Sequence, residues 1–102
     1  MTGWTKVEAR PLDALLRDLG VTTLVFTGCT TSVCVESTLR DAFFRDYRCL
    51  VLADCTAEPI GHALERSNHD ASLFLIQLMF GWVSHSATFI EALATQTAVA
   101  AV

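Results

Sequence analysis

The first part of the chain changes from a helical to a strand pattern of apolar residues. A stripe of leucines at positions i, i+3, i+4 and i+7 is formed by Leu12, Leu15, Leu16 and Leu19. Pro11 suits a first helical turn and Gly20 suits the position after the last, so we expect an amphipathic helix over 12–19. Residues 21–26 follow as a β-branched and aromatic run without polar alternation, which is typical of a buried parallel strand.

The same alternation continues through the middle of the chain. A second apolar stripe predicts a helix over 33–46 and consists of Val35, Leu39, Ala42 and Phe43. Residues 49–53 predict the next strand. The polar segment 54–61 comes directly after it, which is where open α/β sheets place ligand-contacting loops.

The last third predicts a long helix, a short strand and a final helix. The long helix would cover 62–80, with four residues facing inward: Ala71, Phe74, Leu75 and Leu78. Gly81 ends it before a strand over 82–84. Thr88 and Glu91 have the spacing of a capping box, which predicts that the final helix begins there.

The order of these elements predicts the α/β class. Strands that alternate with helices imply right-handed crossovers and a parallel sheet of about three strands flanked by helices. We expect a single domain over 1–102, with flexible ends at 1–7 and 95–102. Because an apolar strand at a sheet edge recruits pairing from another chain, we also expect a homo-oligomer or a complementing chain.

Charge and composition exclude several classes of partner. The chain has 7 basic and 11 acidic residues, a net charge of −4, and their scattered placement predicts binding neither to nucleic acid nor to a membrane surface. Gln77, Gly81 and Ser84 break the longest apolar stretches well below the roughly 20 residues that span a bilayer. Residues 1–7 do not resemble a secretory signal. We therefore expect a cytoplasmic protein whose partners are small molecules or other protein chains.

The four cysteines fall on predicted strands and at a helix start. This placement favours reduced thiols over a disulfide framework, and no two cysteines form a C-x-x-C pair that would indicate zinc or redox chemistry. We expect no metal and no organic cofactor. Three of the thiols are interpreted as packing residues or turn neighbours, namely Cys29, Cys49 and Cys55.

Cys34 is the candidate nucleophile. Residues 26–41 indicate a strand, a tight turn and a helix that opens close to this thiol. The unpaired N–H groups and the positive dipole end of such a helix favour the thiolate, and the same N–H groups can hold an oxyanion. The alternative is a free cysteine that serves only as a small buried apolar residue.

The cysteine segment resembles one enzyme family. Residues 27–42, TGCTTSVCVESTLRDA, are similar to the motif of the isochorismatase-like cysteine hydrolases. Residues 50–54, LVLAD, look like the next strand of that family. Residues 80–84, FGWVS, are similar to its closing strand, particularly in the ureidoacrylate and N-carbamoyl amidohydrolase branch. The resemblance covers 12–93.

This resemblance implies a Rossmann-like, six-stranded parallel sheet, of which the chain holds the part that bears the cysteine. It implies hydrolysis by a Cys–Lys–Asp triad with Cys34 as nucleophile. It also implies a non-proline cis peptide between Cys29 and Thr30, and an oxyanion hole made by the backbone N–H groups of Thr30 and Cys34. Ser32 stands where related amidohydrolases usually have asparagine.

The resemblance does not supply the other two members of the triad. The family has its aspartate at the end of the first strand and its lysine just before the helix that corresponds to 12–19. No aspartate precedes Asp13, which itself matches a helix start. Lys6 precedes the helix, as the family's lysine does, but it lies too close to the helix. The alternative interpretation of Lys6 is a solvated terminal lysine. Whether the chain is an enzyme therefore stays open.

The remaining candidates each have a structural alternative. His62 and His69 share one face of the predicted helix, and with His85 they suggest a substitute base or a metal site, or else surface residues. Trp82 is expected to pack beneath the end of the sheet, with a pocket lining as the alternative. Asp54 is expected to order its own loop, with substrate contact as the alternative.

Two functions follow from these observations. The first is a cysteine hydrolase that cleaves an amide or carbamoyl C–N bond of a small molecule through a Cys34 acyl-enzyme. The second is a noncatalytic half-domain that serves as an assembly or ligand-binding module. The two differ in whether a lysine and an aspartate reach Cys34.

Overall fold

The computed structural model describes residues 10–95, in which helices and strands alternate. The elements are α1 (Arg10–Asp18), β1 (Thr23–Cys29), η2 (Thr31–Val35), α2 (Glu36–Phe44), β2 (Arg48–Ala57), α3 (Asn68–Leu75), η3 (Ile76–Phe80), β3 (Trp82–Ser84) and α4 (Ser86–Ala94). The segments η2 and η3 are π-helical turns continuous with α2 and α3. This order confirms the predicted α/β class. Lys6 and the end segments 1–7 and 96–102 lie outside the described residues.

The three strands form one parallel sheet in the order β1-β2-β3. Thr23 pairs with Arg48 at the start of the sheet, and pairing continues in step as far as Phe26. It then shifts, so that Gly28 pairs with Thr56. Because of this second stretch of pairing, β2 extends to Ala57, and the prediction that the loop begins at residue 54 is wrong.

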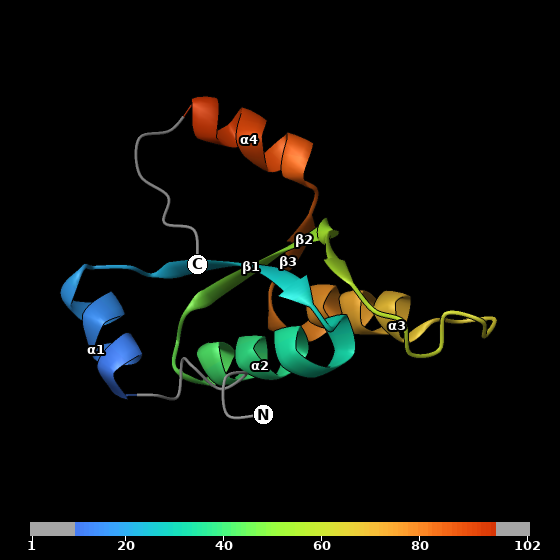
Figure 1. Cartoon of the computed structure of the whole chain (residues 1–102). Coiled ribbons are helices and arrows are strands. Elements are labelled where there is room, and N and C mark those ends of the chain that lie inside the picture. Colours follow the sequence, from blue (N-terminus) through green and yellow to red (C-terminus); the bar gives the residue numbers. More distant parts are fainter. Residues whose placement is uncertain (1–9, 96–102) are drawn as a thin grey trace.

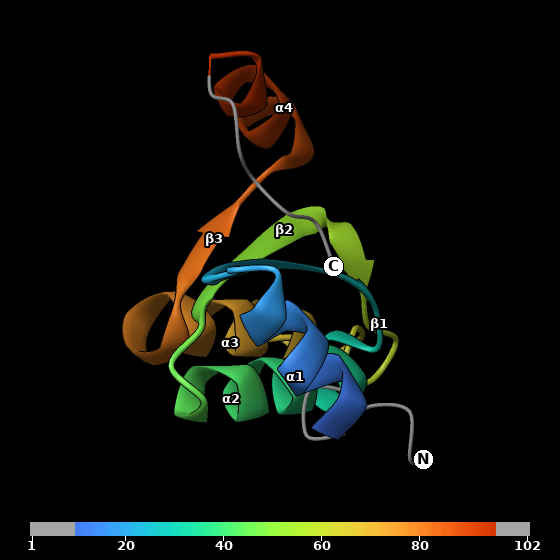
Figure 2. The same cartoon turned by 90° about the vertical axis from the view of Figure 1, so that its left-hand side faces the viewer.

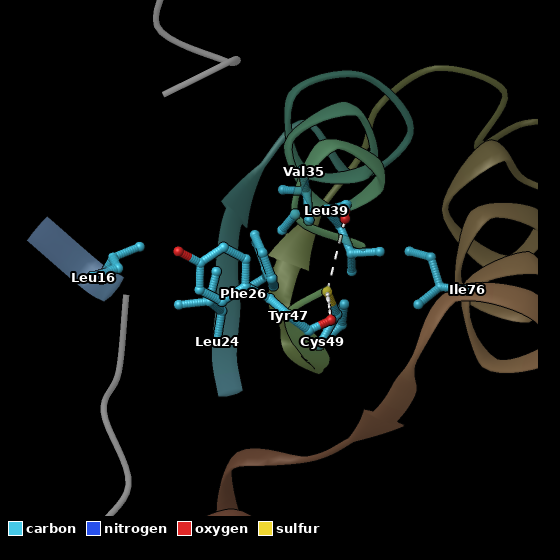
Figure 3. Packing of buried hydrophobic residues seen from close by; sticks show 10 residues of the cluster. Leu16, Leu24, Phe26, Val35, Leu39, Tyr47, Cys49 and Ile76 are labelled. Atoms are coloured by element: carbon cyan, nitrogen blue, oxygen red, sulfur yellow. Dashed lines mark hydrogen bonds between the residues drawn. The ribbon is translucent and has the colours of Figure 1, made fainter. Parts of the chain in front are cut away.

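The hydrophobic core lies between the sheet and the helices. The helices α1, α2 and α3 lie on the same side of the sheet in both views, whereas α4 projects beyond the end of β3 (Figures 1 and 2). Most residues of the core cluster lie on α1, β1, β2, η2–α2 and η3 (Figure 3). The cluster comprises Leu16, Leu24, Phe26, Val35, Leu39, Ala42, Tyr47, Cys49, Val51 and Ile76.

The first two helices largely match their predictions. Of the leucine stripe on α1, Leu16 is buried but Leu15 and Leu19 are exposed. On η2 and α2, Val35, Leu39 and Ala42 are buried as expected, and Phe43 remains 38% exposed.

The prediction of a helix over 62–80 is wrong in its start and in its inward face. The chain forms turns and bends over 60–66, and α3 begins after Ser67, whose hydroxyl accepts the Asp70 N–H at 3.1 Å. Ser72 and Ile76 are the buried residues, whereas Phe74 and Leu78 are 64% and 65% exposed. The start is wrong because the helix begins only after its capping serine. The inward face is wrong because Ser72 and Ile76, four residues apart, lie on the buried side, which the apolar residues alone do not indicate.

The last helix also begins earlier than predicted. Its first residue is Ser86, and His85 occupies the N-cap position without a side-chain capping bond. The predicted capping pair Thr88 and Glu91 therefore lies inside α4. Within residues 10–95, no helix has the length and apolar character needed to cross a membrane.

A cluster of four polar and charged side chains holds α1 at the amino end of the sheet, namely Asp13, Arg17, Arg45 and Tyr47. The carboxylate of Asp13 accepts the Tyr47 hydroxyl at 2.6 Å, and it pairs with Arg45 at 3.2 Å and Arg17 at 3.3 Å. The hydrogen bond from Tyr47, together with the two guanidinium groups, holds the pKa of Asp13 below its ordinary value against the opposing effect of burial. Asp13 is thus engaged at the end of the sheet opposite Cys34.

Candidate active site around Cys34

Cys34 lies in the helical turn that follows β1. The peptide bond between Cys29 and Thr30 is cis, as the family resemblance implied. Thr30 is extended, with φ −99° and ψ 135°, and its carbonyl oxygen accepts the N–H groups of Val33 and Val35, both at 3.1 Å. The side chain of Cys34 is half-buried. The chain thus changes from strand to helix in a single step, which places Thr30 and Cys34 in one turn.

The loop after β2 reaches this turn through Glu58. Oε1 of Glu58 accepts the Ser32 N–H at 2.8 Å and also the Ser32 hydroxyl, while Oε2 accepts the Ile60 N–H at 3.3 Å. Burial raises the pKa of Glu58, but the hydrogen bonds from Ser32 and Ile60 and the nearby His69 outweigh it, so the pKa lies below its ordinary value. Glu58 therefore keeps its negative charge beside the turn.

The amino end of α3 reaches the same turn through His69. The hydroxyl of Thr31, which is fully buried, shares a hydrogen bond of 2.9 Å with Nδ1 of His69. The predicted pairing of His62 with His69 on one helix face is wrong, because His62 precedes α3 and its Nδ1 lies 3.0 Å from the Pro59 carbonyl oxygen. Over the described range 10–95, no three His, Cys, Asp or Glu side chains are grouped as metal ligands would be.

The structure brings together only part of the predicted site. Thr30 and Cys34 share a turn, whereas Lys6 lies outside the described residues. In the part of the chain that is described, no hydrogen bond or ion pair involves the Cys34 thiol. Asp54 also binds α4, since it accepts the N–H and the hydroxyl of Ser86.

Several secondary predictions are corrected by burial. Trp82 does not pack beneath the sheet, because 57% of it is exposed on β3. All four cysteines are free, which agrees with reduced thiols. The packing role holds for Cys49, which is buried, whereas Cys29 and Cys55 are exposed near the carboxyl ends of β1 and β2.

Glu58 was missed as a site residue. The only sequence signal for it was a carboxylate in the polar segment after a buried strand. Its contact with Ser32 spans 26 positions of the sequence, and no local pattern reports a contact of that range. The assembled site is an accessible thiol in a helical turn whose preceding residues are bound by a carboxylate and an imidazole. Such a turn can present a nucleophile and nearby backbone donors to a carbonyl group.

Residues 2–88 match the family model described as the isochorismatase domain. Over 83 residues the chain is 57% identical to the ureidoacrylate amidohydrolase RutB of Methylobacterium radiotolerans, covering 81% of this chain and 31% of that protein. Over 88 residues it is 49% identical to RutB of Methylorubrum extorquens, covering 86% of this chain and 34% of that protein. The chain thus spans about a third of the length of the curated relatives it matches.

Solved structures have the same arrangement of elements. An isochorismatase-like hydrolase from Alkaliphilus metalliredigens superposes with a TM-score of 0.69 at 34% identity, covering 79% of this chain and 42% of that one. A cysteine hydrolase from Pseudomonas syringae superposes with a TM-score of 0.71 at 33% identity, covering 82% of this chain and 42% of that one.

Proposed function

The chain belongs to the isochorismatase family, and from this premise we propose that it carries the nucleophile of a cysteine hydrolase acting on an amide or carbamoyl C–N bond of a small molecule. The observation that carries the proposal is the position of Cys34. Its half-buried thiol lies in the first helical turn after β1, at the carboxyl end of a parallel sheet. Open α/β sheets bind their ligands at that end.

In the proposed reaction, the Cys34 thiolate attacks the carbonyl carbon of the substrate. The carbonyl π electrons move to the oxygen, where the backbone N–H groups of Thr30 and Cys34 stabilise the negative charge. Collapse of this intermediate breaks the C–N bond, and the amine leaves after it takes up a proton. Water then hydrolyses the acyl-enzyme and restores the thiol.

The proposal requires a base and a cation from outside the described residues. Lys6 is the single lysine of this sequence, and we propose it, or a residue supplied by a partner chain, as the triad lysine. The proposed triad aspartate likewise lies outside residues 10–95 or is supplied by a partner chain. We therefore propose that the active form is a homo-oligomer or a complex with a complementing chain, and that it works in the cytoplasm, which suits four free thiols.

A second candidate function is a noncatalytic half-domain that serves in assembly or ligand binding. It is favoured by one observation, namely that no group in residues 10–95 forms a hydrogen bond or ion pair with the Cys34 thiol. A thiol without a base or a cation beside it is a poor catalyst at neutral pH.

Ammonia release from simple N-carbamoyl amides and from ureidoacrylate separates the two functions. We expect release by the full chain, and a fall of at least about a thousandfold in Cys34→Ala, because the covalent route is lost. Cys55→Ala is the matched control, since Cys55 is an exposed thiol outside the turn. Equal rates in Cys34→Ala and the wild type would contradict the role of Cys34 as nucleophile, and no release by the wild type would show that this chain alone is not a hydrolase.

A further inference from the structure

The helical turn that contains Cys34, η2, has no capping side chain of its own. Thr30 occupies its N-cap position without a side-chain hydrogen bond, although the first N–H groups of a helix have no partner within the helix. Glu58 supplies the acceptor for the Ser32 N–H from 26 residues away. The position of the turn therefore depends on a side chain of the loop after β2.

Glu58 is itself held by the loop that carries it. One oxygen binds Ser32 and the other accepts the N–H of Ile60, so the carboxylate connects the two segments through separate atoms. Because Oε2 already accepts the Ile60 N–H, the carboxylate loses part of its rotational freedom before Oε1 binds the turn. It thereby holds the Ser32 amide in one orientation.

The neighbouring residue is held independently. Thr31 is fully buried and hydrogen bonds to His69 of α3, so two successive residues before Cys34 are bound by two different segments. Breaking this partly buried hydrogen bond would leave the buried Thr31 hydroxyl without its partner, which is costly. Of these two contacts, the one from Glu58 involves a full charge and is the stronger type.

We propose that Glu58 is a positioning residue for Cys34, which fixes the turn through Ser32 so that the thiol and the adjacent backbone N–H groups keep one orientation. This proposal rests on the function proposed for Cys34. Glu58 does not touch the reacting atoms. Its effect reaches catalysis through the backbone between Ser32 and Cys34.

The direct test is hydrogen exchange at the Ser32 amide of the full chain, measured residue by residue by nuclear magnetic resonance. In Glu58→Ala we expect exchange at Ser32 to accelerate about tenfold or more, because a hydrogen bond to a charged acceptor is lost. Glu58→Gln retains an acceptor oxygen and should recover a large part of the protection. Glu65→Ala removes a carboxylate of the same loop that is exposed, and should leave Ser32 unchanged.

The second test separates positioning from simple stabilisation. Tyr47→Phe removes a hydrogen bond to Asp13 at the end of the sheet opposite Cys34 and serves as a structural control. We expect Glu58→Ala to lower kcat at least about tenfold with KM within twofold of the wild type, since orientation affects the transition state more than ground-state binding. Tyr47→Phe should leave kcat within twofold.

The outcomes distinguish this proposal from the proposed function. If the wild type releases no ammonia, hydrolysis by this chain alone is excluded, and exchange at Ser32 still decides whether Glu58 holds the turn. If the wild type is active, unchanged exchange at Ser32 in Glu58→Ala overturns the positioning role. It is also overturned if Tyr47→Phe lowers kcat as much as Glu58→Ala does.

Discussion

The carboxylate of Asp54 accepts both the backbone N–H of Ser86, at 2.8 Å, and the Ser86 hydroxyl. Asp54 lies on β2 and Ser86 is the first residue of α4, so this contact spans 32 positions of the sequence. None of the residues of α4 is buried. Asp54 therefore acts as a cap supplied from another element, and it holds a helix that projects from the sheet (Figure 1).

Asp54→Ala should release the amino end of α4. The first turn would lose its acceptor and His85 has no capping bond to replace it, so we expect amide exchange over 86–90 to accelerate about tenfold. Exchange in β1 should not change. Glu91→Ala provides a comparison, because Glu91 is an exposed carboxylate of α4 itself. Equal exchange in Asp54→Ala and the wild type would contradict the role of Asp54 as a cap.

Tyr47→Phe tests the cluster that fastens α1. The substitution removes one hydroxyl, and we expect Tm at pH 7 to fall by about 4 °C. Because the Tyr47 hydrogen bond and two arginines lower the pKa of Asp13, ionised Asp13 stabilises the folded chain above its ordinary pKa of 3.8, and this stabilisation is lost as pH falls through the folded value.

Thermal unfolding measured at a series of pH values tests whether the stabilisation by ionised Asp13 is lost as pH falls. The difference in Tm between Tyr47→Phe and the wild type should shrink below pH 3.8. A difference that is constant from pH 7 to the acid limit would mean that the hydroxyl contributes by packing and not by its bond to the Asp13 carboxylate.

Gly81→Ala should destabilise the sheet. Gly81 has φ 176°, an extended conformation open to any residue, so its constraint is steric. A Cβ there would overlap the Cys49 carbonyl oxygen and lie 3.0 Å from its carbonyl carbon. We expect the free energy of unfolding, measured with urea, to fall by about 2 kcal/mol or more.

A substitution at a second glycine, Gly20, distinguishes the cost of this overlap from a general cost of replacing glycine. Gly20 has open space around its Cα and a φ of +72°, which asparagine tolerates. Gly20→Asn should therefore cost much less than Gly81→Ala. If both substitutions cost the same, the close approach to Cys49 is not the cause.

Three of the four thiols should differ in how they react with iodoacetamide. Burial raises the pKa of Cys49 from 9.0 to about 11, and its thiol faces the carbonyl oxygens of Leu39 and Tyr47 (Figure 3). At pH 9, peptide mass spectrometry should find Cys29 and Cys55 modified and Cys49 protected in the folded chain. Modification of all four at one rate would contradict the burial of Cys49.

The same shift predicts a loss of stability in alkali. Between pH 9 and about 11 the unfolded Cys49 gives up its proton while the folded residue retains it, so the free energy of unfolding falls as pH rises through this window. Cys49→Ala should weaken this dependence. An unchanged slope in Cys49→Ala would assign the alkaline loss to other groups.

The sequence predicts those parts of the fold that depend on neighbouring residues. The stripe on α1 and the β-branched run of β1 are local patterns, and both elements form. The extension of β2 depends on pairing of Thr56 with Gly28, which no local pattern reports. The helical stripe fails at Phe74 because the buried face of α3 and η3 carries Ser72 and Ile76, and which face is buried depends on tertiary packing that no local pattern reports.

Part of the candidate site could likewise be predicted from the sequence and part could not. Thr30 and Cys34 could be found because strand, turn and helix are contiguous in the sequence. Glu58 and His69 reach the turn across 26 and 38 residues, and either side chain read alone is an ordinary surface residue. Their role becomes visible only when the loop after β2 and the start of α3 are placed in space.

The sheet order gives its two outer strands unequal lengths, seven residues for β1 and three for β3. The outer side of β1 is therefore the longer template for a further strand. A parallel strand added there would end beside Cys29, one residue before the turn of Cys34 begins, so the side chains after its last residue would arrive next to the thiol. The register of such a strand would decide which of its residues reach the sulfur, and a shift of one position would turn each side chain to the opposite face.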